Sequence, residues 1–400
     1  MSTRMRALLA AVLLAAAPAK AQIDDAKRLF LAGGYEDAVG NLGPSAPYGF
    51  LYLNRPGAAG PGSAFRLALA PVYADAELGL PSLFGSRTDL GLGLSGGGYA
   101  FGHAEIRRGD EKPGEDFIGH GGGPSASLYP RLGDIGPAPL NGVLRVSAVY
   151  TDYQRTARTA ALFEPPPDEW TGAARAGLRL GGVEPGMDRG RAAEASVWAE
   201  TRLRDRPASY GYNGDRYVRR NVNLYWARVL LSLPTPGGVH ASGGLNAGGG
   251  GGVGRLSAYT LGGMLTQTSE FPLILPGYFG QEISASRYVH AWAHAGVPIR
   301  GSKSFLVNFT AAVANVKPVY GTDPGGIHHA GLAAGLSFEP AEGFLRADLT
   351  YGYAPTALRG AHRGAQSLAF NFEYDFLAPA NLPEPLSRTR QQGLRWLFGR

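Results

Sequence analysis

Residues 367–376 read Ser-Leu-Ala-Phe-Asn-Phe-Glu-Tyr-Asp-Phe, and this stretch decides the fold. Every second side chain is apolar, namely Leu368, Phe370, Phe372, Tyr374 and Phe376. Successive side chains of a strand point to opposite faces, and a membrane-spanning barrel turns apolar side chains outward and polar ones toward its lumen. The stretch therefore predicts the closing strand of such a barrel, with its aromatic row facing lipid.

The same period of two recurs along the chain. It is clear at residues 144–151, 193–204 and 345–353, and weaker at 65–69, 90–94, 174–180, 225–233 and 332–338. A strand crosses a bilayer in roughly 10 residues, and the connections alternate between tight turns and long polar loops. We therefore predict an all-β fold, a transmembrane antiparallel β-barrel of about 16 strands over residues 63–376.

The first residues carry the order of an export signal. Arg4 and Arg6 precede an apolar run at 7–17 and small residues at 19–21, so we expect residues 1–21 to be a cleaved signal peptide. The run is shorter than the roughly 20 residues that a transmembrane helix needs. An exported chain without cysteine has no disulfides, and a closed sheet can hold it together instead. The net charge of +6 comes mostly from dispersed arginines, so we expect no nucleic-acid surface.

Two segments flank the expected barrel. Between Asp24 and Leu42 the apolar spacing predicts two short helices, which with the Pro/Gly-rich residues 57–62 make a periplasmic leader at 22–62. We interpret this leader as a plug or latch, with a partner-binding module as the alternative. Residues 377–400 form a predicted periplasmic tail, in which Ser387–Arg400 is either a basic amphipathic helix or a disordered segment. Asp24–Leu42 and Ser387–Arg400 are thus the possible contacts for a periplasmic partner.

One constellation points to a family. Leu261-Gly262-Gly263 is followed by a loop and then by five alternating strands that end at Phe376. This order resembles the BamA/TamA-like outer-membrane assembly-factor superfamily, which includes surface-antigen and patatin-linked barrels. The resemblance implies a loop folded back into the barrel at about residues 256–283, and an extracellular turn is the alternative. The tip of that loop would be Leu275, Pro276, Gly277 and Tyr278.

The chain departs from the family pattern in three places. Pro276 stands where the family has a tip arginine, and the strand at residues 309–313 lacks the acid that contacts that arginine. The loss of only the arginine or only the acid would leave a charge unpaired in a confined lumen. The loss of both therefore predicts that the loop is held in the lumen without an ion pair, an arrangement that we call a neutral lock. Residues 22–62 leave no room for the family's periplasmic POTRA domains, so the chain resembles the branch without them.

The polar faces of the strands carry charges that we expect to line the lumen. These are Arg145, Arg175, Arg179, Glu194, Glu200, Arg202 and Arg204. Facing rows of arginines and acids create a constriction in diffusion porins. A wall that is merely stiffened by salt bridges is an equal alternative.

No motif for catalysis or cofactor binding emerges. His290 and His294 would lie about 13 Å apart on one strand face, too far to share a metal ion. The glycine run 248–252 lacks the residues of a phosphate loop, and we interpret it as a strand end or loop. We therefore expect no catalytic, metal or cofactor site.

The resemblance implies a role in protein or lipid translocation or assembly at the bacterial outer membrane, without enzymatic activity. Its first and last strands would meet at a lateral seam, and outer-membrane lipid is an expected partner. The alternatives are a passive diffusion porin with an arginine-lined lumen and a barrel enzyme acting on lipid or peptide. The client or solute and the oligomeric state do not follow from the sequence.

Overall fold

The computed structural model describes residues 27–377 except 41–42, 83–86, 99–100, 137, 182–191, 235–237, 267–269, 303 and 341–343. The expected signal peptide and the Ser387–Arg400 segment lie outside these described residues. No helix within the described part is long and apolar enough to cross a membrane.

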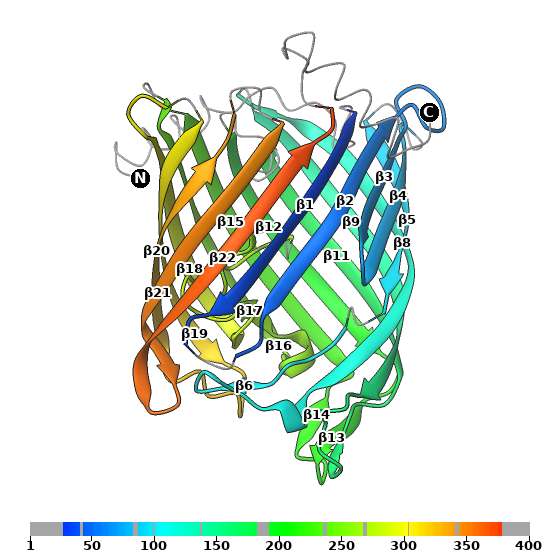
Figure 1. The fold of residues 1–400 in the computed structure, drawn as a ribbon. Coiled ribbons are helices and arrows are strands. Elements are labelled where there is room, and N and C mark those ends of the chain that lie inside the picture. The colour runs from blue at the N-terminus through cyan, green and yellow to red at the C-terminus, as the bar shows by residue number, and fades with distance from the viewer. Residues whose placement is uncertain are drawn as a thin grey trace, which may run out of the picture.

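Sixteen antiparallel strands form a closed barrel, which confirms the predicted architecture (Figure 1). The wall strands are β1 (Arg28–Ala38), β2 (Ala46–Pro56), β3 (Ala64–Ala70), β4 (Tyr73–Leu80), β5 (Thr88–Gly97), β8 (Phe117–Ile135), β9 (Ala138–Arg155), β11 (Glu169–Gly181), β12 (Ala192–Arg204), β15 (Asn221–Pro234), β16 (His240–Gly251), β18 (Ile283–Pro298), β19 (Phe305–Pro318), β20 (His328–Phe338), β21 (Leu345–Arg359) and β22 (His362–Asp375). Each pairs with its sequence neighbours along the wall, and β1 closes the barrel by pairing with β22 from Phe30↔Asp375 to Ala38↔Ser367.

The helices predicted between Asp24 and Leu42 are wrong. Arg28–Ala38 is the first wall strand, and the barrel begins there instead of at residue 63. The backbone hydrogen bonds to β2 on one side and to β22 on the other stabilise this segment as a strand. They contribute more than the weak helical spacing of its apolar residues would contribute to a helix. The predicted periplasmic leader at 22–62 is thus largely wall, because β2 also lies within it.

The two faces of the wall differ as alternation predicts. On β22, Leu368 and Phe370 are 44% and 45% exposed, whereas Ser367 and Ala369 between them are buried. Aromatic pairs mark both ends of the apolar band, Tyr150 with Trp170 at one end and the exposed Phe305 with the half-buried Phe338 at the other. This is the outward surface of a lipid-facing barrel.

The two ends of the barrel are unequal. The terminal end, at the top of Figure 1, carries the start of β1, the end of β22 and turns such as 299–304. The loop end carries the connections 98–116, 156–168, 205–220 and 319–327. These contain the short strands β6 (Ile106–Arg107), β7 (Asp110–Glu111), β10 (Phe163–Glu164), β13 (Ala208–Tyr212) and β14 (Arg216–Val218), and the 3-10 turn η1 (Pro113–Glu115).

An inward row of hydrogen bonds crosses the junction of β1 and β22. Asp348 accepts hydrogen bonds from Ser337 on β20 and, at 3.4 Å, from Asn371 on β22. Tyr48 on β2 reaches over β1 and donates to Asn371. Tyr48 can do so because Gly34, its register partner on β1, has no side chain.

Gly34→Ala should therefore destabilise the barrel. A Cβ at Gly34 would lie 2.4 Å from Tyr48 Cε1 and 2.8 Å from the Phe370 carbonyl oxygen, an overpacking that costs about 1–3 kcal/mol. Gly49→Ala on β2 is the matched control, since its Cβ would meet only the Ala32 oxygen at 3.8 Å. The measurement is the urea midpoint of the detergent-folded protein. Equal midpoints for the two variants would contradict the packing argument.

Candidate functional site

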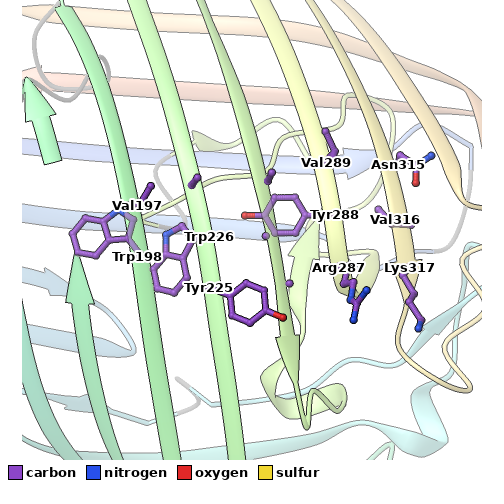
Figure 2. A pocket seen from close by; sticks show the side chains of 14 residues that line it. Val197, Trp198, Tyr225, Trp226, Arg287, Tyr288, Val289, Asn315, Val316 and Lys317 are labelled. Carbon is purple, nitrogen blue, oxygen red and sulfur yellow. The ribbon is translucent and has the colours of Figure 1, made fainter. Parts of the chain in front are cut away.

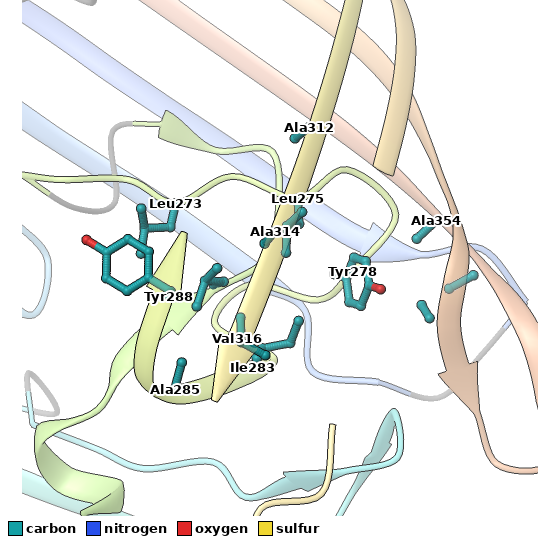
Figure 3. Packing of buried hydrophobic residues seen from close by; sticks show 13 residues of the cluster. Leu273, Leu275, Tyr278, Ile283, Ala285, Tyr288, Ala312, Ala314, Val316 and Ala354 are labelled. Carbon is teal, nitrogen blue, oxygen red and sulfur yellow. The ribbon is translucent and has the colours of Figure 1, made fainter. Parts of the chain in front are cut away.

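The segment between β16 and β18 folds back into the barrel, and we call its described residues, 252–266 and 270–282, the inward loop (Figure 1). It begins with the 3-10 turn η3 (Arg255–Ser257) and the short strand β17 (Tyr259–Leu261), which pairs with β18. Its residues Leu261, Leu275 and Tyr278 are fully buried and form one cluster with inward side chains of β18, β19 and β21 (Figure 3). The barrel wall is therefore the surface against which this loop packs.

The predicted tip residues lie against β20 and β21. A Cβ at Gly331 would lie 2.3 Å from the Pro276 oxygen, and one at Gly352 would lie 2.6 Å from the Gly277 nitrogen. Gly277 itself has φ +83°, a conformation that side chains disfavour. Glycines in the wall and in the loop thus allow their backbones to touch.

Tyr278 fixes the tip through its hydroxyl. That oxygen lies 3.0 Å from His329 Nδ1 on β20 and 3.0 Å from Thr356 Oγ1 on β21. The ring is fully buried, so these contacts satisfy the one polar atom of the side chain. Tyr278 therefore ties the loop to two neighbouring strands.

The expected neutral lock is wrong, because an ion pair holds the loop. Arg359 at the end of β21 lies 2.8 Å from Glu282 of the loop (Nη1 to Oε1) and donates to the Gly277 carbonyl at 3.1 Å. Its guanidinium carbon also lies 3.9 Å from the ring centre of Phe279. The arginine comes from the wall and the acid from the loop, which is why the tip sequence alone gave no sign of the pair.

Further contacts anchor the loop around the lumen. On β18, His290 Nε2 donates to the Ile274 carbonyl at 2.8 Å. On β1, Glu36 accepts a 2.8 Å hydrogen bond from the Met264 backbone. Across the lumen, Arg175 on β11 lies 2.8 Å from Glu270 of the loop. The inward loop thus bridges β11 to β1 and β21, a span that crosses the lumen.

The seven charges predicted for the lumen all have ion-pair partners. Arg175 lies 2.6 Å from Glu200, Arg179 lies 2.8 Å from Glu194, and Arg204 lies 3.1 Å from Glu169. Arg202 also pairs with Glu200, and Arg145 with Glu77. Each of these charges is therefore paired with another side chain of the wall.

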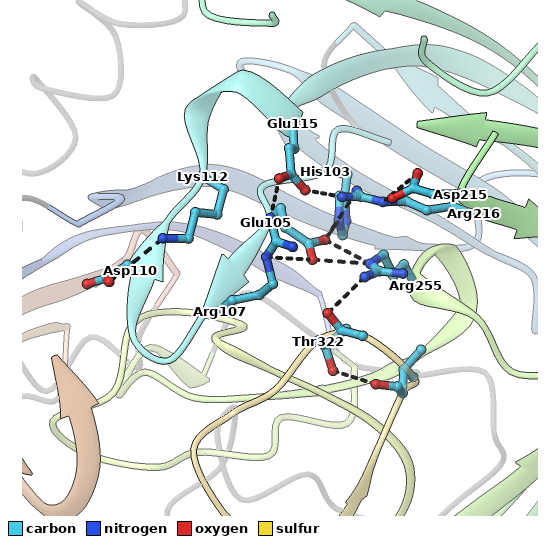
Figure 4. A network of polar contacts seen from close by, with 12 residues as sticks. His103, Glu105, Arg107, Asp110, Lys112, Glu115, Asp215, Arg216, Arg255 and Thr322 are labelled. Carbon is cyan, nitrogen blue, oxygen red and sulfur yellow. Dashed lines mark hydrogen bonds and ion pairs between the residues drawn. The ribbon is translucent and has the colours of Figure 1, made fainter. Parts of the chain in front are cut away.

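A polar cluster joins the connections at the loop end (Figure 4). Glu105 lies 3.0 Å from His103 Nε2 and 3.0 Å from Arg255 Nε of the inward loop. Arg216 pairs with Glu115 and lies 3.6 Å from Glu105. Burial alone would raise the pKa of Glu105, but His103, Arg255 and Arg216 together lower it. The ionised carboxylate therefore stabilises this cluster, and that stabilisation is lost as the pH falls through the lowered pKa.

Sequence reasoning missed several of these contacts. Arg359, Glu282 and Glu36 belong to no motif, and their partners lie far away in the chain. The sequence pattern only excludes a metal ion shared by His290 and His294, whereas in the structure His290 holds the loop backbone. The alternation on β18 places His290 inward, but no local signal identifies the carbonyl that it binds.

The solved structures that share this architecture include two CdiB proteins and a BamA. CdiB from Acinetobacter baumannii superposes with a TM-score of 0.58 at 11% identity over 87% of this chain and 60% of its own. CdiB from Escherichia coli gives 0.56 at 13% identity over 87% and 63%. BamA from Haemophilus ducreyi lacking POTRA domains 1-3 gives 0.55 at 11% identity over 88% and 70%. The fold is that of the BamA and CdiB barrels.

The likeness is one of structure alone. No protein-family model matches the sequence, and no curated protein matches it either. The chain spans less than two thirds of the length of the CdiB proteins that it resembles.

Arg359→Gln should release the inward loop. The change leaves Glu282 buried beside a neutral partner, and breaking a buried pair in this way costs about 3–5 kcal/mol. We expect faster protease cleavage within residues 264–282 and a lower urea midpoint, with partial recovery in the double variant Arg359→Gln/Glu282→Gln. Arg346→Gln, which removes a wall pair with Asp348, is the control. Cleavage that is unchanged in Arg359→Gln would show that the pair does not hold the loop.

Proposed function

We propose that this chain is a bacterial outer-membrane barrel that serves in protein or lipid translocation or assembly, with the inward loop as its plug. The observation that carries the proposal is the loop itself, which is held on β11 through Arg175 and on β21 through Arg359. The terminal end would face the periplasm and the loop end the outside. The proposal assigns no catalytic residue.

The ion pairing of the wall favours a plugged barrel over a diffusion porin. A porin selects solutes with charges that face an open lumen. Here Glu194 is nearly fully buried between Arg179 and Arg228, and Arg175 is engaged by the loop through Glu270. The guanidinium groups of these arginines are occupied by ion pairs, which leaves them few donors for a passing solute.

The junction of β1 and β22 is the second element of the proposal. Among the strands that the structure describes, this is the only junction between strands far apart in sequence, so opening it would expose two strand edges without breaking a hairpin. An exposed edge can accept a further strand through main-chain hydrogen bonds. A client segment could therefore pair with β1 or β22 during assembly.

The plug predicts a low conductance. Refolded protein in a planar bilayer should show small or flickering currents, and deletion of Thr266–Gly280 should make them large and steady, because the segment that crosses the lumen is removed. Single-channel recording measures both. A large, steady and ion-selective current in the intact protein, unchanged by the deletion, would favour a porin instead.

If the junction of β1 and β22, which we call the seam, opens during assembly, a crosslink across it should block the activity. The chain has no cysteine, so Asp37→Cys with Leu368→Cys, register partners on β1 and β22, would give a single disulfide across the seam. In liposomes, the uncrosslinked protein should accelerate the folding of a urea-unfolded eight-stranded barrel. The oxidised variant should lose this acceleration, and reduction of its disulfide should restore it.

The control places cysteines at Ala311 and Leu332, register partners inside the wall on β19 and β20. This crosslink should leave the acceleration unchanged. No acceleration by the uncrosslinked protein, or equal activity of the oxidised seam variant, would argue against a role in barrel assembly through the seam.

A further inference from the structure

The outward face of the wall is hollowed where β16 approaches the loop end. The hollow has a volume of about 830 Å³ and is lined by β12, β15, β16, β18 and β19 (Figure 2). It lies beside the glycine run, since Gly248 and Gly249 are among its lining residues. β16 runs to Gly251, so the run is a strand end, one of the two interpretations that the sequence left open.

The floor of this hollow is made of small residues in register. Ala227 and Ala247 are partners on β15 and β16, and they are flanked by Val197 on β12 and Val289 on β18. The two valines are 53% and 52% exposed, so they stand out from the wall. The two alanines between the two valines form an apolar trough that is two strands wide, which suits a hydrocarbon chain.

Two cations stand at the end of the trough nearer the loop end. Arg287 on β18 and Lys317 on β19 are register partners and are both exposed. Neither has an ion-pair partner among the residues that the structure describes, in contrast to the paired arginines of the lumen. Directly opposite cross-strand residues lie about 5 Å apart, so both side chains can reach one anion.

The shape of this end is fixed from inside the barrel. The Tyr259 hydroxyl, on the inward loop, accepts a 3.1 Å hydrogen bond from the Tyr225 backbone and lies 3.0 Å from the Gly249 carbonyl oxygen. A Cβ at Gly249 would lie 3.1 Å from Arg287 Cγ and 3.3 Å from Tyr225 Cε2. Tyr225 and Arg287 therefore lean over Gly249 from either side, on a backbone that the inward loop braces.

We propose that this hollow binds one membrane lipid with an anionic phosphate headgroup. An acyl chain lies in the trough over Ala247, and the phosphate accepts hydrogen bonds from Arg287 and Lys317. The two cations match the lipid in charge and in their position along the membrane normal. They stand at the rim of the apolar band, where the headgroups of the leaflet at the loop end are found. Charge-assisted hydrogen bonds to phosphate are strong, and two cations offer donors to different oxygens.

The test is native mass spectrometry of the folded, detergent-solubilised chain with dioleoylphosphatidylglycerol and dioleoylglycerol, which share acyl chains but differ in the phosphate. We expect the protein to retain dioleoylphosphatidylglycerol tightly and not to retain dioleoylglycerol. Arg287→Gln/Lys317→Gln should weaken this retention about 30-fold, since each basic residue near a membrane surface contributes about fivefold. Ala247→Phe, which fills the trough and keeps both cations, should weaken it as well.

Arg55→Gln, which removes an exposed cation on β2, is the matched control and should change nothing. Gel mobility of unheated samples verifies that each variant is folded. Inorganic phosphate at 10-fold excess over the lipid should not displace it, because the trough supplies part of the affinity. Equal retention by the double variant, equal retention of dioleoylglycerol, or displacement by inorganic phosphate would each overturn the proposal.

Discussion

Closure of the sheet between β1 and β22 is the constraint on which the rest of the structure depends. Within a bilayer no water is present to satisfy a free backbone N–H or C=O group, so a spanning sheet has to leave no edge. Nine register pairs from Phe30↔Asp375 to Ala38↔Ser367 meet this requirement. Closure also separates an outer apolar face from an inner polar one, and it creates the lumen that the inward loop fills.

Charges inside that lumen are tolerated because they are paired. Glu194 lies between Arg179 and Arg228, and Glu282 lies beside Arg359. The attraction within a close pair offsets the cost of taking its charges out of water. This attraction does not depend on which element carries the arginine. A loop tip that carries Pro276 can therefore still be held by an ion pair, since β21 supplies the cation and the loop supplies the acid.

Glycine acts in this protein mainly by permitting close approach. Gly331 and Gly352 let the loop tip lie on the wall, and Gly34 lets Tyr48 reach across β1 to Asn371. Gly249 plays the same part for Tyr225 and Arg287 on the outer face. Because Tyr259 of the inward loop binds the Gly249 carbonyl, the element that fills the lumen also shapes the apolar outer surface of the wall.

The sequence by itself determined the barrel, because alternation with a period of two is a local property of each strand. Residues 144–151 and 367–375 show it plainly, and both stretches lie in wall strands. It misassigned β1, where Gly33 and Gly34 look like a break and where one of the two pairing partners, β22, lies more than 300 residues away. The strand and the ion pair of Arg359 with Glu282 were decided only by the tertiary structure, because their stabilising partners come from distant segments that meet when the sheet closes.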